Sequence, residues 1–259
     1  TWGFEHGVNE NAVAIGNHSV FSKDPVEEVP GLIGMDLVRL GLERGRDARE
    51  ALEVIASLIE RHGQGGAAFG PGKPGYHNSF LVADPSSAWL LETSNRHWAA
   101  RRVELEGVSN HITQSANWEI GSRELESFAR GEGWWQGRMR RDVAAAYRNP
   151  NVPGCISEGL LRRSRELLQA QRGKHDVRGL QELLRDHGAA GLGPPQGGRF
   201  TDESYFTLCM HADPVGTTTA SLVAPLPAER SPAWAVWVGF GSPCIGIFLP
   251  VYLDGVLPA

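Results

Sequence analysis

Cysteine and histidine are the side chains of this chain with the widest chemistry, and their spacing limits what they can do. The 259 residues include nine histidines and three cysteines, Cys155, Cys209 and Cys244. No His-Glu-x-x-His and no paired Cys-x-x-Cys occurs, and the histidines lack ligand spacing, so we expect no metal site. The odd number and wide separation of the cysteines argue against a disulfide framework and favour a reducing, cytoplasmic compartment. We expect all three to be buried apolar residues.

Other familiar catalytic signatures are also missing. The sequence has no Gly-x-x-x-x-Gly-Lys-Ser/Thr phosphate loop and no Gly-x-Ser-x-Gly elbow, so no cofactor is expected. Six short regions remain as carriers of chemistry. They are Gly7-Val8-Asn9-Glu10, Gly63-Gln64-Gly65-Gly66, Tyr76-His77-Asn78-Ser79-Phe80-Leu81, Val108-Ser109-Asn110-His111-Ile112, Gly133-Trp134-Trp135-Gln136-Gly137, and Cys209-Met210-His211 with Thr218-Thr219-Ala220-Ser221 in the late strands.

The elements that must position these segments can be read from hydrophobic periodicity. A strand is expected over Asn11 to Asn17, followed by a helix around Ile33 to Leu42 and a second helix that Asp47 caps and Gly63 ends. Short strands are then expected at Phe80–Ala83, Ala88–Glu92, Trp98–Ala100 and Val108–Ile112. Helices are expected at Arg123–Arg130, Met139–Tyr147, Ile156–Arg172 and Val177–His187. The last strands are expected at Tyr205–His211, Thr217–Ala224, Ala233–Phe240 and Cys244–Pro250.

This order of elements predicts an α+β fold. Runs of strands and runs of helices do not alternate as βαβ units would, so two antiparallel sheets between helical layers are expected. No repeat and no clean linker divides the chain, and we therefore predict a single domain over residues 1–259.

Charge and hydropathy exclude two classes of partner. The formal net charge is -5 and no lysine or arginine run occurs, so nucleic acid is not an expected partner. The arginines at 138, 140 and 141 stand beside Asp142 on an expected helix, where a solvated face explains them. No stretch of eighteen apolar residues occurs, so no membrane partner is expected either. The sequence does not indicate an oligomeric state.

Taken in order along the chain, several segments resemble the secernins, which belong with the cysteine-nucleophile dipeptidases. The resemblance lies in the run Met35 to Arg44, the Gly-Gln-Gly-Gly turn, the Tyr-His-Asn-Ser-Phe-Leu strand and the Gly-Trp-Trp-x-Gly element. It covers nearly the whole chain. It implies an αββα N-terminal-nucleophile hydrolase fold and the hydrolysis of a small peptide or acyl-amide substrate.

The same resemblance implies a mechanism. In the family, an amino-terminal cysteine is the nucleophile and its own α-amine is the base, since an α-amine titrates near pH 8. This nucleophile precedes the Gly-x-Asn-Glu segment, so we expect it upstream of residue 1 and expect the chain to be incomplete at both ends. Thr1 falls in a segment that relatives carry internally. We therefore interpret it as a truncation point and expect no cysteine-dependent catalysis from the 259 residues alone.

Site residues follow from the match to the family's motifs. Asn110 matches an asparagine that lines the oxyanion hole of related amidases, and Asn17 is expected to be a second donor or a substrate contact. Glu10 matches the Gly-x-Asn-Glu turn, in which Asn9 is expected to be structural. His77 is a possible base or substrate contact, although a strand histidine is more often held by neighbouring polar groups. Arg163, with Arg162, falls where relatives place an arginine near the nucleophile.

Two alternatives stay open at this stage. Because eukaryotic secernins are linked to regulated secretion, a non-catalytic interaction protein is one of them. Acyl transfer to an amine, as in penicillin-type acyltransferases of the same fold, is the other.

Overall fold

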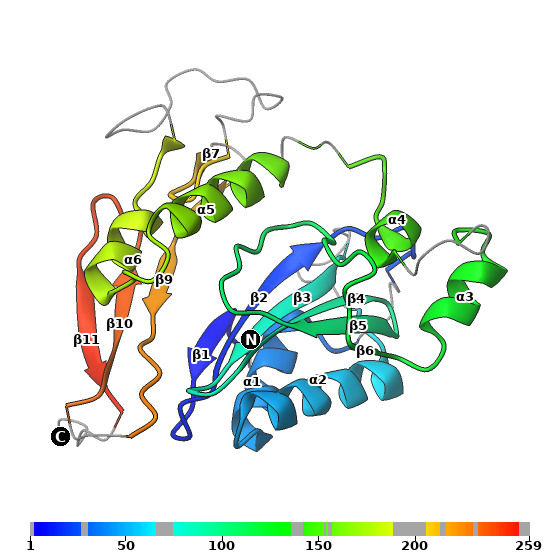
Figure 1. The fold of residues 1–259 in the computed structure, drawn as a ribbon, viewed down its shortest axis with the longest axis horizontal. Helices are drawn as coiled ribbons and strands as arrows, with labels where there is room; N and C mark the ends of the chain where they lie inside the picture. The colour runs from blue at the N-terminus through cyan, green and yellow to red at the C-terminus, as the bar shows by residue number, and fades with distance from the viewer. Residues whose placement is uncertain are drawn as a thin grey trace. The chain divides into compact units, whose positions relative to one another are not determined.

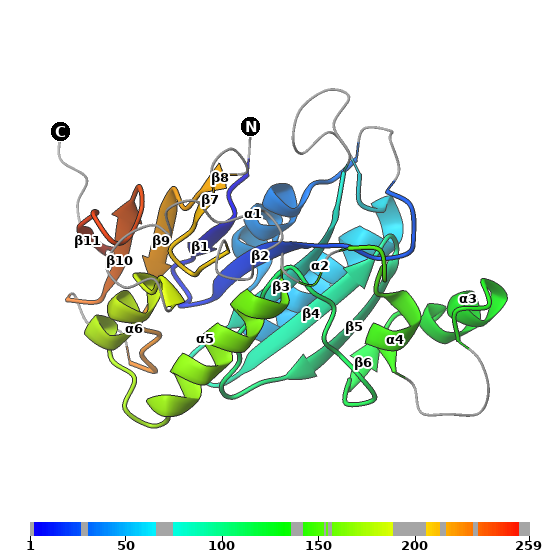
Figure 2. The same cartoon turned by 90° about the horizontal axis from the view of Figure 1, so that it is seen from above.

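The computed structural model describes residues 3–26, 31–65, 75–135, 142–152, 154, 157–188, 206–212, 216–229 and 233–253. Within these ranges the fold is α+β, and every paired strand is antiparallel (Figures 1 and 2), as the element order predicts. Contacts divide the chain into two compact units. The first unit comprises residues 1–104 and 110–152, and the second comprises residues 105–109 and 153–259.

The first unit is built on a six-stranded sheet whose strands follow chain order. Its strands are β1 (His6–Val8), β2 (Ala14–Val20), β3 (His77–Ala83), β4 (Ala88–Ser94), β5 (His97–Arg102) and β6 (Ile120–Gly121). Two helices, α1 (Gly34–Arg44) and α2 (Ala48–His62), cover one face of the sheet (Figure 1). The short helices α3 (Leu125–Gly131) and α4 (Val143–Tyr147) complete the unit.

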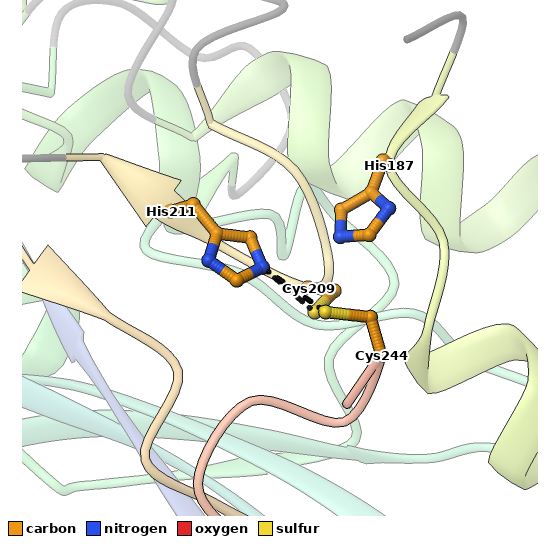
Figure 3. Close-up of side chains that lie close together, drawn as sticks. All are labelled: His187, Cys209, His211 and Cys244. Carbon is orange, nitrogen blue, oxygen red and sulfur yellow. Dashed lines mark hydrogen bonds between the residues drawn. The ribbon is translucent and has the colours of Figure 1, made fainter. Parts of the chain in front are cut away.

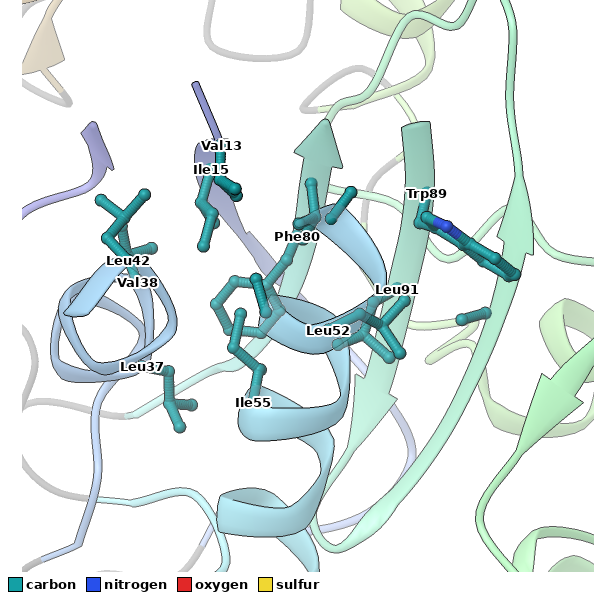
Figure 4. Packing of buried hydrophobic residues seen from close by; sticks show 14 of the residues in the cluster. Val13, Ile15, Leu37, Val38, Leu42, Leu52, Ile55, Phe80, Trp89 and Leu91 are labelled. Carbon is teal, nitrogen blue, oxygen red and sulfur yellow. The ribbon is translucent and has the colours of Figure 1, made fainter. Parts of the chain in front are cut away.

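A hydrophobic core fills the space between these two helices and the sheet. Ile15, Phe80 and Leu91 point from β2, β3 and β4 toward Leu52 and Ile55 of α2 (Figure 4), and all five are at most 2% exposed. Side chains alternate between the faces of a strand, so every second residue of each strand reaches the helices. Burying each of these side chains contributes about 1.5–3 kcal/mol before entropy is counted.

Local sequence signals explain where the two helices begin and end. The Asp47 carboxylate accepts a hydrogen bond of 2.7 Å from the backbone N–H of Glu50, which caps α2. Gly63 follows α2 with a φ of 72°, a backbone conformation that favours glycine. At the start of α1, Gly34 lies against Asn17 and Asn78, where an added Cβ would come within 2.0 Å of the Asn78 oxygen. Only glycine therefore lets α1 approach these strands.

Two strand predictions in the first unit were wrong. The strand expected over Asn11 to Asn17 is β2, which begins at Ala14. The Asn9 carboxamide oxygen accepts from the backbone N–H groups of Asn11 and Val13 and holds these residues in a turn. Val108 to Ile112 forms no strand. After it, the backbone N–H groups of Thr113 and Gln114 donate to the buried carboxylate of Glu92 and not to a neighbouring strand.

The second unit contains helices α5 (Glu158–Ala170) and α6 (Val177–Leu184) and two small sheets. A three-stranded sheet has the order β11 (Phe248–Tyr252), β10 (Ala235–Phe240) and β9 (Ala220–Val223), and α6 packs beside β9. A two-stranded sheet pairs β7 (His211–Ala212) with β8 (Gly216–Thr217). Of the expected late strands, Ala233–Phe240 is present as β10, and Thr217–Ala224 is divided between β8 and β9. The strand expected at Cys244–Pro250 begins only at Phe248, and the prediction of a strand at Tyr205–His211 was wrong for residues 206–210. Tyr205 and the parts of two expected helices at residues 139–141 and 156 lie outside the described residues.

Candidate functional site

A buried chain of amide side chains crosses the end of the first sheet beneath the start of α1. The Nδ2 of Asn17 donates to Oδ1 of Asn78 at 2.9 Å, and Nδ2 of Asn78 donates to Oε1 of Gln64 at 2.9 Å. Gln64 in turn donates to the hydroxyl of Thr93 at 2.9 Å and to the carbonyl of Asn95 at 2.7 Å. This network joins the Gly-Gln-Gly-Gly turn to β2, β3 and β4. It explains why amides stand in two of the segments singled out by sequence.

Asn17 keeps hydrogen-bonding capacity beyond this network. Its Nδ2 carries two hydrogens, of which the bond to Asn78 uses one. Its Oδ1 is buried and has no hydrogen-bond partner within the described part of the chain. A half-buried amide with an unused N–H can donate to a substrate oxygen.

Asn110 lies beside the same strand. Its Nδ2 donates to the carbonyl oxygen of Ser19 at 2.9 Å and lies 2.8 Å from the Ser19 hydroxyl. Ser19 is two residues from Asn17 on β2, so the two predicted oxyanion donors lie along the second half of this strand. Because both acceptors belong to one serine, Ser19 fixes the orientation of the Asn110 amide.

The carboxylate of Glu92 holds the segment that follows Asn110. Both of its oxygens accept from the backbone N–H of Thr113 at 2.9 Å. In addition, Oε1 accepts from the Thr113 hydroxyl, and Oε2 accepts from the backbone N–H of Gln114 at 2.8 Å. Burial raises the pKa of Glu92 to about 7, while the bonds from Gln114 and Thr113 act in the opposite direction. Glu92 therefore positions a loop and titrates near neutral pH.

His77 is buried on β3 and only 1% exposed. Its Nδ1 lies 2.9 Å from the hydroxyl of Ser22, and Ser22 accepts a hydrogen bond from Ser94. Burial lowers the pKa of His77 to about 4, so its ring is neutral at physiological pH. Neighbouring hydroxyls thus hold this histidine in the interior of the first unit.

Glu10 is exposed and lies at the other end of β2, in the turn that precedes it. It lines a surface hollow of about 410 Å³ together with residues of β1 and α1, among them Phe4, His6 and Arg39. Asn9 beside it is buried and donates to the carbonyls of Leu42 and Gly45. Its structural role is therefore confirmed.

Arg163 belongs to the second unit. Its guanidinium donates to both carboxylate oxygens of Asp186, at 2.9 and 2.7 Å. This bidentate pair lowers the pKa of Asp186, with the hydrogen bond from Arg163 as the largest cause. Arg163 thus fixes the segment after α6, and no described contact joins it to Asn17, Asn110, His77 or Glu10.

The second unit also contains a group of side chains that the sequence did not single out together. His187, Cys209, His211 and Cys244 come from three separate segments and meet in space (Figure 3), with ligand atoms all within 4.8 Å of one another. The one local signal is Cys209-Met210-His211, since residues i and i+2 of an extended strand share a face. His187 and Cys244 are too distant in sequence for spacing to show the group.

Cys209 is fully buried, as expected, but Cys244 is only partly buried. Cys155 lies outside the described residues.

Neither described cysteine suits the role of a nucleophile in the first unit. Burial raises the pKa of the Cys209 thiol to about 11, so the thiolate is rare at neutral pH. Both Cys209 and Cys244 belong to the second unit. Residues 5–127, which include every predicted site residue except Arg163, contain no cysteine.

Among the described residues, no helix combines the length and the apolar composition that a bilayer crossing requires.

Residues 5–127 match the model of Peptidase family C69. The match covers the strands β1 to β6 and the helices α1 and α2, and therefore the whole amide network, Asn110 and Glu92. This segment is therefore similar to peptidase family C69, which includes dipeptidases and secernin-like proteins.

Proposed function

We propose that the protein hydrolyses small peptides or acyl-amides, using an N-terminal cysteine nucleophile supplied by sequence upstream of Thr1. The observation that carries this proposal is the match of residues 5–127 to a peptidase family. The placement of the thiols supports the upstream nucleophile, because the matched segment has no cysteine and both described cysteines are in the second unit.

The proposed reaction uses the α-amine of the terminal cysteine, its thiol, and hydrogen-bond donors for the oxyanion. The α-amine of the terminal cysteine takes the thiol proton, the thiolate attacks the amide carbonyl, and the departing amine receives the proton. Water then hydrolyses the thioester and releases the acid. Hydrogen-bond donors aimed at the developing oxyanion stabilise each tetrahedral intermediate, and one such donor is worth about 10²–10³ in kcat.

Asn110 and Asn17 are the donors in this scheme. Support comes from their position, because Asn110 bonds to Ser19 and Asn17 stands two residues before Ser19 on the same strand. Asn17 supplies its unused N–H, and Asn110 supplies a second donor when the substrate oxygen replaces the Ser19 hydroxyl as the acceptor of one of its two N–H groups. Glu10 is the proposed contact for a charged end of the substrate, and its position in the lining of a surface hollow supports this role. His77 and Arg163 act through neighbours and hold structure in place.

The test uses the full-length gene product with its upstream cysteine. Dipeptide hydrolysis is compared in the wild type, a Cys→Ala variant at the upstream position, and Asn110→Ala. We expect no turnover from the cysteine variant, and a loss of roughly two to three orders of magnitude in kcat for Asn110→Ala. Asn17→Ala should lower kcat in the same direction, and the exposed Asn151→Ala is the matched control and should match the wild type.

Three outcomes would contradict the proposal. A change of less than about threefold for Asn110→Ala, in a protein with unchanged thermal stability, would remove this residue from the oxyanion site. Transfer of the acyl group to an added amine in preference to water would indicate an acyltransferase. An intact protein with no activity on any dipeptide or acyl-amide would favour a non-catalytic interaction protein. The 259-residue chain alone is expected to be inactive.

A further inference from the structure

The four side chains of the histidine–cysteine cluster, defined as His187, Cys209, His211 and Cys244, converge on one point. The Nε2 of His211 lies 3.4 Å from the sulfur of Cys209 and 3.3 Å from the sulfur of Cys244. The ring of His187 stands 5.3 Å from the ring of His211, centroid to centroid, at an angle of 45°. Figure 3 shows both sulfurs side by side near the nitrogen of His211, with the imidazole of His187 beside them.

Hydrogen bonding between neutral groups does not explain this geometry. An imidazole nitrogen has either one lone pair or one hydrogen, so it makes one well-aligned hydrogen bond, yet two sulfurs lie equally close to Nε2 of His211. The two cysteines form no disulfide, although Cys209 and Cys244 are hydrogen-bonded to each other. A cation at the centre would give all four atoms a common partner.

The distances fit a tetrahedral zinc ion. With Zn–S near 2.3 Å and Zn–N near 2.0–2.1 Å, neighbouring sulfur and nitrogen ligands lie about 3.5 Å apart. The sulfur–nitrogen distances of 3.3 and 3.4 Å match this edge. The widest separation in the cluster is within 4.8 Å, so one side chain must close by about 1 Å when the metal binds.

Neighbouring hydrogen bonds hold the segments that carry these ligands. The backbone N–H of Cys209 donates to the carbonyl of Asp186 at 3.0 Å, which joins the Cys209 segment to the residue before His187. Arg163 anchors Asp186 through its bidentate ion pair. Such supporting contacts orient metal ligands in advance of binding.

The Cys244 loop is fixed in a similar way. Arg185, at the end of α6, donates to the carbonyl of Pro243 at 2.8 Å and lies 3.4 Å from the carbonyl of Gly246. The hydroxyl of Ser242 donates to the carbonyl of Thr218 at 3.3 Å. These bonds bracket Cys244 on both sides.

We propose that His187, Cys209, His211 and Cys244 bind one zinc ion as a tetrahedral structural site. Two thiolates with two imidazoles are a common zinc ligand set, whereas magnesium and calcium require oxygen ligands. Four protein ligands fill the coordination sphere, so the ion holds structure and does not activate water. It ties the end of α6, strand β7 and the loop between β10 and β11 to one another.

The small apolar cluster of the second unit gives a reason for a structural metal ion. Among its described residues, the buried hydrophobic cluster consists of Phe206 and Ala212, against which Leu160 and Met210 pack. Other described residues of this unit, Leu161, Val223, Trp234 and Val236, are buried outside that cluster. A unit whose apolar cluster is this small is a kind that metals commonly stabilise, because metal binding adds directly to its folding free energy.

The direct test measures metal in the reduced wild-type chain, purified without chelator or added metal. Elemental analysis should find about one zinc per chain. After removal of the metal under reducing conditions, Co²⁺ should restore one equivalent, with a thiolate-to-cobalt charge-transfer band and the visible bands of tetrahedral cobalt. Zinc should displace the cobalt with an apparent Kd at or below about 50 nM.

Variants then assign the ligands. Cys209→Ser and Cys244→Ser should each abolish the charge-transfer intensity of one thiolate and weaken zinc binding by at least about 10-fold. His62→Ala, an exposed histidine of α2, is the control and should bind zinc as the wild type does. If a cysteine variant fails to fold, the cobalt spectrum of the wild-type protein still decides the matter.

Other results would overturn the proposal. These are zinc far below one equivalent together with no thiolate-to-cobalt band, a Cys209–Cys244 disulfide in the protein as isolated under reducing conditions, or full occupancy by copper or iron in place of zinc.

Discussion

The two compact units of the chain bury different kinds of side chain. In the first, Ile15, Phe80, Leu91 and their neighbours form a continuous apolar layer between α1, α2 and the sheet. In the described residues of the second, the apolar cluster centres on Phe206 and Ala212, and the most closely packed polar group consists of two cysteines and two histidines. Solvent exclusion alone can hold the first unit together. In the zinc proposal the second relies on specific ligand geometry, so the two should respond differently to mutation, pH and metal.

Truncation of the apolar layer should have the largest effect. Phe80→Ala removes a fully buried ring from β3 and leaves a cavity, which should lower the free energy of unfolding of the first unit by about 3–5 kcal/mol. Urea unfolding, followed with a probe in each unit, measures this. The loss should be independent of added zinc. A loss below about 1 kcal/mol, or one that zinc reverses, would contradict the apolar layer as the source of stability.

Glu92 should give the first unit a pH dependence of intermediate size. Its folded pKa of about 7 lies above its unfolded value, so the stability it contributes is present below about pH 4.5 and is lost as pH rises through 7. His18 and His77, with folded pKa values of about 4, act in the opposite sense and lose stability as pH falls below 6.5.

A matched comparison isolates the carboxylate. Relative to Glu92→Gln, the wild type should gain about 2 kcal/mol of stability as pH falls from 7 to 5, because the histidine contributions cancel between the two proteins. Exposed Glu53→Gln should show no such change relative to the wild type. Parallel stability curves for wild type and Glu92→Gln would show that Glu92 has the same pKa in the folded and unfolded chains.

Helix capping should have the smallest effect and should be alike in both units. Asp47 caps α2 and Asp176 caps α6, and each accepts from a backbone N–H three residues later at 2.7 Å. Asp47→Ala and Asp176→Ala should each cost about 1 kcal/mol in the unit that contains them. Equal losses of unfolding free energy would indicate that the two units differ in their interiors and not at their helix ends. A cost for Asp176 several times that for Asp47 would instead indicate that helix ends dominate the second unit.

The first unit was the more predictable of the two from sequence. Apolar residues at helical spacing placed α1 and α2, and Asp47 and Gly63 marked the ends of α2, because these signals act over a few residues. The segment around Asn110 was expected to be a strand because it is β-capable. The backbone N–H groups directly after it, at Thr113 and Gln114, donate instead to Glu92, a partner far away in the sequence that no local pattern could identify.

The site residues of the first unit were likewise more predictable from the sequence than those of the second. Motifs singled out the segments that contain Gln64 and Asn78, and Asn17 was expected separately as a donor or substrate contact. The structure shows that the three form one hydrogen-bonded chain, which the sequence did not indicate. The histidine–cysteine cluster was missed because its ligands come from three segments, and only Cys209 and His211 are close in sequence. The ligands of such a site come together only in the tertiary structure, so their spacing in the sequence does not reveal them.

Amide hydrogen exchange, with and without a zinc chelator under reducing conditions, tests the difference between the units most directly. Removal of the metal should abolish protection in β7 and β10 while β3 and β4 keep theirs, because only the second unit depends on the ion. Unchanged protection in β7 and β10, or an equal loss in both units, would contradict the claim that a bound metal holds the second unit and an apolar core holds the first.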